Sequence, residues 1–146
     1  MNKQKWNKID KEITSLMKKL GIPFLRYSLA TIFIWFGILK SFGVSPAQKL
    51  VTNTVYWFNP EWFVPFLGWW EVLIGICFLY KPLIRIGIPL LLIQMAGTFL
   101  PILILPSVVY GDLPYTFTLE GQYIIKNIVI IASALVIGSH VRDKDQ

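Results

Sequence analysis

The stretch IGIPLLLIQMAGTFLPILIL, residues 86–105, decides the fold class, because its twenty residues include no charged side chain. A helix of this length covers about 30 Å, the thickness of the hydrocarbon core of a bilayer. Three further apolar runs lie at about 24–42, 63–80 and 122–139. We therefore predict an all-α fold, an integral membrane four-helix bundle.

The composition and the placement of charge also point to a membrane protein. Hydrophobic residues make up 55% of the 146 residues and charged residues only 15%. Six of the 14 Lys and Arg residues precede Pro23, two lie between the second and third runs, two follow the fourth, and only Lys49 lies in the other two loops. The positive-inside rule then predicts cytoplasmic termini, in a multi-pass protein of the bacterial inner membrane. The net charge of +6 thus reflects contact with a lipid bilayer, and we expect no nucleic-acid partner.

The first 22 residues form a basic amphipathic segment, which precedes a transmembrane domain at 23–140 and a tail at 141–146. Apolar side chains recur at helical spacing in this segment, at Trp6, Ile9, Ile13, Leu16, Met17 and Leu20. Gly21 and Pro23 are typical of a helix end and predict that this helix stops there. Two roles stay open for it: it lies on anionic lipid at the cytoplasmic surface, or it is a solvated tail that helps to set topology.

The first outer loop predicts a short helix that lies in the membrane interface. Ser45 and Pro46 resemble an N-cap followed by proline at the first helical position. A stripe of small and apolar side chains follows, at Ala47, Leu50, Val51, Thr54, Val55 and Phe58. The second span must begin near Trp62 or Phe63 to reach a sufficient length. Thr118 is placed to cap the fourth span.

Polar side chains inside the runs predict a cluster in the outer third of the bundle. They come from all four spans: Lys40 from the first, Glu71 from the second, Gln94 and Thr98 from the third, and Lys126 and Asn127 from the fourth. An isolated charge at the membrane centre costs about 2.5–3.5 kcal/mol on insertion scales. We therefore expect Glu71 to bridge Lys40 and Lys126, with Glu120 covering the cluster from the outer face. Gly37, Gly68 and Gly75 would let the helices approach closely. Arg26, near the start of the first span, is close enough to the interface to snorkel.

The candidate ligand-binding residues are Lys40, Trp70, Glu71, Gln94, Thr98, Glu120, Gln122, Lys126 and Asn127. Two interpretations stay open. Ionisable residues inside a membrane indicate a functional site, whereas the same residues can also hold helices together and do nothing more. The chain has a single histidine and a single cysteine, so we expect no metal site and no thiol pair. No catalytic residue can be assigned.

Three segments carry a family resemblance: TLEGQYIIKNIV at 118–129, the segment from Arg26 through FIWFG at 33–37 to Lys40, and GWWE at 68–71 with Gly75. Together they resemble the DoxX-like family of small bacterial membrane proteins, over about residues 24–140. The resemblance implies a four-helix inner-membrane bundle. It also implies functions associated with thiosulfate–quinone oxidation, oxidative-stress membrane complexes or resistance to reactive chlorine. At matching positions the conspicuous polar residues would be Lys40, Glu71, Glu120, Gln122, Lys126 and Asn127.

Three functions follow as hypotheses. The first is a membrane subunit of a redox or oxidative-stress-response system that binds quinone or another small ligand in the outer polar pocket. No cofactor-binding motif is visible, so electrons would come from a partner oxidoreductase. The second is a small-solute or proton transporter or channel, in which a homo-oligomer could supply a pore. The third is a membrane assembly or scaffold factor without a ligand.

Overall fold

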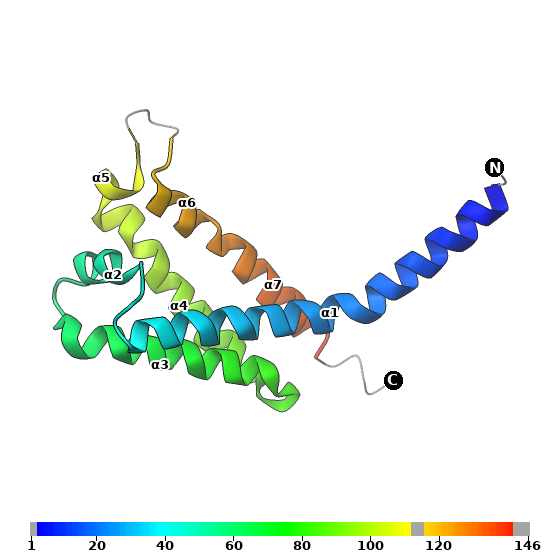
Figure 1. Ribbon diagram of the computed structural model, residues 1–146, viewed down its shortest axis with the longest axis horizontal. Helices are drawn as coiled ribbons and strands as arrows, with labels where there is room; N and C mark the ends of the chain where they lie inside the picture. The colour runs from blue at the N-terminus through cyan, green and yellow to red at the C-terminus, as the bar shows by residue number, and fades with distance from the viewer. Residues whose placement is uncertain (1–2, 112–115, 142–146) are drawn as a thin grey trace.

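The computed structural model describes residues 3–111 and 116–141, with side chains from Trp6 onward. The fold is all-α, as predicted, and the described residues outside helices form only an isolated antiparallel bridge between Tyr110 and Phe117. The elements in chain order are α1 (Lys3–Ser41), α2 (Gln48–Thr54), α3 (Pro60–Leu79), the 3-10 helix η1 (Lys81–Leu83), α4 (Ile84–Ile104), α5 (Pro106–Val109), α6 (Leu119–Ile125) and α7 (Asn127–Ser139) (Figure 1).

Within the described ranges, four helical segments are long and apolar enough to cross a membrane. They are Trp6–Ser41, Pro60–Leu79, Lys81–Ile104 and Leu119–Ser139. Each exceeds the roughly 17 residues that a spanning helix needs. The chain is therefore a multi-pass membrane protein, as the apolar runs predict.

The predicted helix end at Gly21 and Pro23 is wrong, because α1 continues through both residues to Ser41. Proline removes one backbone hydrogen bond, which normally breaks a helix. Here Pro23 lies on an exposed part of the helix, where water or lipid headgroups can satisfy the freed carbonyl. The amphipathic segment is thus a direct extension of the first span, and it projects away from the bundle (Figure 1).

The glycine that ends α1 is Gly43, whose φ of 70° is the only positive φ in the described chain. The amide of Val44 donates to the carbonyl of Leu39 at 3.0 Å, and the amide of Gly43 donates to that of Lys40 at 3.1 Å. These two bonds form a Schellman motif, in which glycine takes the left-handed conformation without steric cost. The motif fixes the end of α1 directly beyond Lys40.

The loop after α1 differs in one detail from the prediction. The helix α2 begins at Gln48, two residues after Pro46, and the hydroxyl of Ser45 accepts from the amide of Ala47 without capping the helix.

The second span begins earlier than expected, at Pro60, because Asn59 accepts a hydrogen bond from the amide of Glu61. Glu71 therefore lies about 16 Å along its helix.

The fourth span is interrupted at Lys126, although it was expected to be continuous. Thr118 caps its first turn, as predicted, by accepting from the amide of Gly121 at 3.1 Å. At the interruption, the amide of Val129 donates to the carbonyl of Lys126, three residues back, at 3.0 Å. This tightened turn separates α6 from α7 without redirecting the chain (Figure 1).

The helices α1 and α3 make the closest contact in the bundle, because glycines face each other across it. A Cβ atom added at Gly37 would lie 2.5 Å from the carbonyl oxygen of Gly68, and one added at Gly75 would lie 2.8 Å from that of Ala30. No side chain fits in either place. The predicted role of these small residues in close helix packing is confirmed.

The core of the bundle lies between two polar ends. Its fully buried side chains include Phe78, Ile74, Leu91 and Ile137. On one side of this core lie Lys40, Glu71 and α2, which we call the Glu71 end. On the other lie Arg26, η1 and the end of α7, which we call the Arg26 end. Because four spans return the chain to its starting side, the segments around Pro23, η1 and His140 share this second end.

Candidate functional site

A buried ion pair between Lys40 and Glu71 is the centre of the candidate site. The Nζ atom of Lys40 lies 2.5 Å from Oε1 of Glu71, and the two side chains are 11% and 6% exposed. The glycine contact between α1 and α3 explains this proximity, because Gly37 precedes Lys40 by one turn and Gly68 precedes Glu71 by one turn. The predicted pairing of Lys40 with Glu71 is confirmed.

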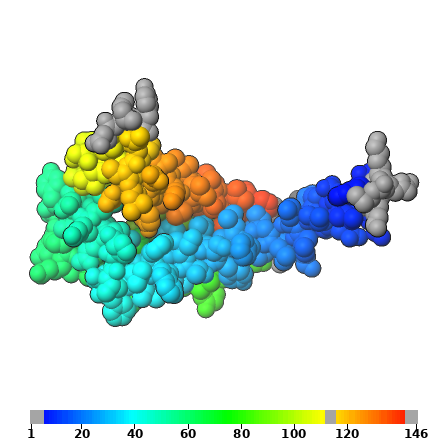
Figure 2. Space-filling model, turned by 45° about the horizontal axis from the view of Figure 1, so that its top comes forward, coloured from blue at the N-terminus to red at the C-terminus, as the bar shows by residue number. Residues whose placement is uncertain are grey.

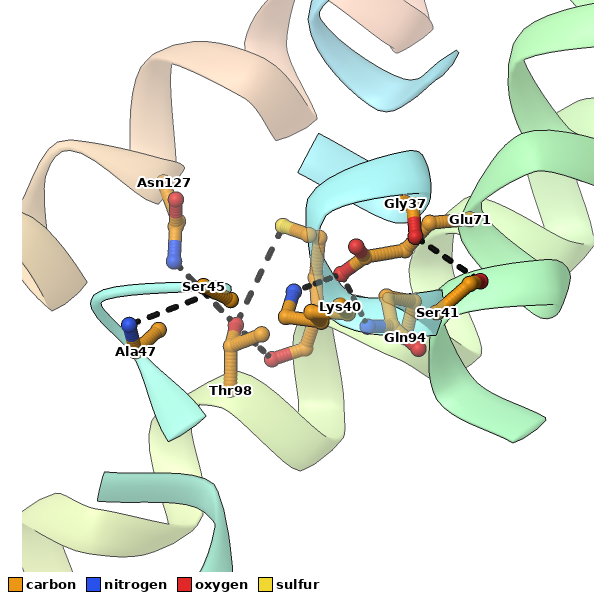
Figure 3. A network of polar contacts seen from close by, with 10 residues as sticks. Gly37, Lys40, Ser41, Ser45, Ala47, Glu71, Gln94, Thr98 and Asn127 are labelled. Atoms are coloured by element: carbon orange, nitrogen blue, oxygen red, sulfur yellow. Dashed lines mark hydrogen bonds and ion pairs between the residues drawn. The ribbon is translucent and has the colours of Figure 1, made fainter. Parts of the chain in front are cut away.

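A third helix contributes Gln94 to the same carboxylate. Its Nε2 atom donates to Oε1 of Glu71 at 2.8 Å, so this oxygen accepts from both Lys40 and Gln94 (Figure 3). The other oxygen, Oε2, is buried and has no hydrogen-bond partner among the described residues. A carboxylate with one orphaned oxygen is only half compensated. It therefore retains the capacity to accept another donor or a proton.

A second, smaller polar group lies beside the first and joins α4 to α7. The Nδ2 atom of Asn127 donates to Oγ1 of Thr98 at 3.3 Å, and this hydroxyl donates to the carbonyl of Met95 at 2.8 Å (Figure 3). Asn127, the first residue of α7, is buried. The two groups together bring in residues from all four spans.

Both groups border a cavity of about 270 Å³ at the Glu71 end. Four of the predicted site residues line it: Lys40, Gln94, Thr98 and Asn127. The remaining walls are mostly apolar and come from α2, α3, α4 and α6. The space is thus a mostly apolar chamber with a few amine, amide and hydroxyl groups in its lining, which is the usual construction of a small-molecule site.

The residues of α2 are the part of the site that the sequence did not assign to it. The predicted interfacial stripe lines the cavity along its whole length, from Ala47, Leu50 and Val51 to Thr54, Val55 and Phe58. This helix contacts α3 and α4, so its apolar face covers the chamber. The signal was present in the helical spacing of the stripe, but the spacing could not say whether lipid or protein lies opposite. Tyr123, also missed, lines the cavity from α6.

Lys126 does not join the cluster, and the predicted bridge from Glu71 to Lys126 is wrong. Its side chain is exposed, and the described residues give it no ion pair. Successive residues of a helix differ by about 100° in direction. Asn127 faces the bundle, so its neighbour Lys126 must point elsewhere, at the same depth but toward the surrounding lipid.

Three other candidate residues lie outside the chamber. Glu120 is exposed and lines an adjoining cavity of about 430 Å³ that also includes Lys49, so it does not cover the Glu71 cluster. The surface between α1 and α2 on one side and α6 on the other is hollowed there (Figure 2). Gln122 is exposed and donates to the carbonyl of Phe117. Trp70 is half-buried and packs near Phe66, with ring centroids 6.2 Å apart.

Among the residues that the structure describes, no three His, Cys, Asp or Glu side chains lie close enough to hold a metal ion. No protein-family model, curated protein or solved structure matches the chain. The site therefore has to be interpreted from its own geometry.

Proposed function

We propose that this chain is the membrane subunit of a redox or oxidative-stress-response system, and that it binds a quinone or a similar small carbonyl compound in the chamber at the Glu71 end. The observation that carries the proposal is the contrast inside the chamber. A mostly apolar lining from four helices is interrupted by a few polar residues, and Lys40 and Asn127 among them carry hydrogen-bond donors.

The donors suit a carbonyl oxygen. An ammonium group has three N–H donors, and Glu71 takes only one from Lys40. The amide of Asn127 has two, of which one reaches Thr98. The walls present aromatic and aliphatic side chains, including Phe58, Phe63 and Leu67. A flat apolar ring with a carbonyl at one edge would fit both features.

The size of the chamber limits the ligand. A cavity of about 270 Å³ lies just below the usual range for ligand pockets, which begins at about 300 Å³. It suits a single-ring head group, with any long apolar tail left in the surrounding lipid. An ionic or multi-ring ligand suits it less well.

In this proposal the carboxylate of Glu71 takes part in moving protons to the bound quinone. Reduction of a quinone to a quinol takes up two electrons and two protons. The chain offers no cofactor motif, so a partner oxidoreductase would supply the electrons. Lys40 touches both the chamber and the carboxylate of Glu71, and it therefore links the ligand to a group with an unoccupied oxygen.

The placement in the cell belongs to the same proposal. The Arg26 end holds the basic first half of α1 at its edge, together with η1 and the end of α7. The positive-inside rule assigns the basic segments of the sequence at these places to the cytoplasm. The Glu71 chamber would then open toward the outer leaflet of a bacterial inner membrane. The resemblance to DoxX-like proteins agrees with this arrangement.

Transport past Glu71 is a weaker alternative. Beyond the carboxylate lies the closed apolar core, where Ile74, Phe78 and Leu91 have no exposed surface. Ser133, which is buried nearby on α7, already donates its hydroxyl to the carbonyl of Val129. A solute would have to cross this core in a single chain. A scaffold without a ligand remains a distinct outcome of the test below.

Binding of a short-chain benzoquinone to the purified protein in non-ionic detergent tests the proposal. Gly97→Leu is the decisive variant, because Gly97 lines the chamber and its Cβ position is open, so we expect a larger side chain there to take up space in the chamber. Gly21→Leu is the matched control, since its Cβ position is also open but lies outside the chamber. We expect binding to the wild type and to the control, and at least tenfold weaker binding to Gly97→Leu.

A second pair separates a specific contact from simple filling. Asn127→Leu removes a donor from the chamber and should weaken binding about tenfold, which corresponds to 1.4 kcal/mol. Lys126→Leu changes the adjacent, outward-facing residue and should leave the affinity unchanged. Equal binding by all four variants, or no binding by the wild type, would refute the proposal and favour the scaffold.

A further inference from the structure

Another cavity, of about 590 Å³, lies at the Arg26 end and is lined by basic side chains from three parts of the chain. They are Lys18, Lys19 and Arg26 of α1, Lys81 and Arg85 around η1, and His140 after α7. No carboxylate is present among the described residues that line it. These basic side chains make the described lining of the cavity electropositive.

Arg26 shows that this cavity is more than a set of surface charges. Its side chain was expected to snorkel, but it is buried, with an exposed fraction of only 7%. Its Nε atom is fully enclosed and has no hydrogen-bond partner among the described residues. The guanidinium lies 4.6 Å above the ring of Tyr27, which is a weak compensation for a buried cation.

A buried arginine cannot relieve this cost by losing its proton, because its guanidinium stays charged in proteins. The described residues supply no anion to it, in contrast to Lys40 at the other end. A bound anionic group would compensate it. The planar donor fork of arginine matches the oxygens of a phosphate group, which it can bind with two parallel hydrogen bonds.

The surroundings of the cavity favour a phosphate that carries acyl chains. Apolar residues such as Ile22, Pro82 and Ile137 line it together with the basic groups. Pro23 also borders a neighbouring apolar groove along α1, lined by Leu16, Met17, Leu20, Phe24 and Tyr27. The cavity lies where the first membrane-spanning segment meets its basic extension, at the expected level of lipid head groups.

We propose that the cavity at the Arg26 end is a binding site for the phosphate group of an anionic phospholipid. Arg26 holds the phosphate from the inner wall, and Arg85, Lys18 and Lys19 surround it from the rim. The acyl chains lie along the apolar side of α1. This site is separate from the Glu71 chamber and does not depend on what that chamber binds.

Thermal unfolding and native mass spectrometry of the full chain, delipidated in non-ionic detergent, test this site. Three additions are compared: phosphatidylglycerol, phosphatidylcholine with the same acyl chains, and inorganic phosphate. We expect phosphatidylglycerol to raise the unfolding temperature by several degrees and to stay bound in the mass spectrum. The other two additions should have little effect.

The variants identify the residues that bind. Arg26→Gln should weaken retention of phosphatidylglycerol at least tenfold, and Arg26→Lys, which keeps the charge but loses the fork, should weaken it less. Arg85→Gln changes an exposed residue at the rim, so it gives a result even if Arg26→Gln fails to fold. Lys8→Gln, with the same charge change on α1 outside the cavity, should bind like the wild type.

Three results would overturn the proposal. Equal stabilisation by phosphatidylcholine would show that the head-group charge is not recognised. Equal stabilisation by inorganic phosphate would assign the site to a free anion. Unchanged retention of phosphatidylglycerol by both Arg26→Lys and Arg85→Gln would show that these guanidinium groups do not hold it.

Discussion

The two ends of the bundle each hold a buried cation, and they treat it in opposite ways. At the Glu71 end, Lys40 lies 2.5 Å from a carboxylate of the same chain. At the Arg26 end, Arg26 is as deeply buried, and the described residues around its cavity are basic or apolar. One charge is thus compensated by a carboxylate of the same chain, whereas the described residues give the other no anionic partner.

The largest expected loss of stability follows from removing the cation that compensates Glu71. Lys40→Met leaves the carboxylate of Glu71 buried with only Gln94 as a donor, and loss of one partner of a buried ion pair costs about 3–5 kcal/mol. We therefore expect a loss of this size in the free energy of unfolding, measured by reversible unfolding in mixed micelles. Wild-type stability in this variant would mean that Glu71 is neutral or that water reaches it.

The next effect tests the glycine contact that brings the pair together. Gly68→Ala places a Cβ atom 2.6 Å from the carbonyl of Gly37, so α1 and α3 must separate. Overpacking of this kind costs about 1–3 kcal/mol. Gly97→Ala is the control, because its Cβ position is open and both changes gain the same helix propensity. The unfolding free energies of the two variants, measured together, should differ by the cost of the clash.

A smaller effect is expected at the uncompensated end. Arg26→Leu removes a buried cation that has no internal anion, so it should change stability in lipid-free, non-ionic detergent by less than about 1 kcal/mol. The same unfolding measurement on Lys40→Met provides the comparison. A loss at Arg26 as large as that at Lys40 would reveal an internal partner for the guanidinium.

The smallest effect concerns the cation that belongs to neither end. Lys126 is exposed on the lipid-facing side and takes no part in an ion pair of the described residues. Lys126→Met should therefore leave the unfolding free energy unchanged or raise it slightly, because a charge is removed from an apolar environment. A clear destabilisation in the same assay would support the ion pair between Glu71 and Lys126 that the sequence predicted.

The sequence was a good guide to the spans and to the depth of polar residues, because both depend on position along the chain. It correctly paired Lys40 with Glu71, and the glycines beside them explain why. It failed for Lys126, because depth does not determine the face of a helix from which a side chain projects. Asn127, one residue later, takes the inward place.

Two other differences between prediction and structure arise where tertiary packing determines the local structure. Gly21 and Pro23 have the composition of a helix end, but α1 passes through them and ends in the Schellman motif at Gly43. The apolar stripe of α2 was expected to face the interface and instead covers the chamber. In both places the local pattern was recognised correctly, and its surroundings could not be known from one sequence.

Two double-mutant cycles test the central claim, that Glu71 is compensated by Lys40 and not by Lys126. One combines Glu71→Gln with Lys40→Met, and the other combines it with Lys126→Met, with the unfolding free energy as the measured quantity. We predict a coupling energy of about 1–3 kcal/mol in the first cycle and no more than about 0.5 kcal/mol in the second. A second coupling as large as the first, or a first coupling near zero, would contradict the account.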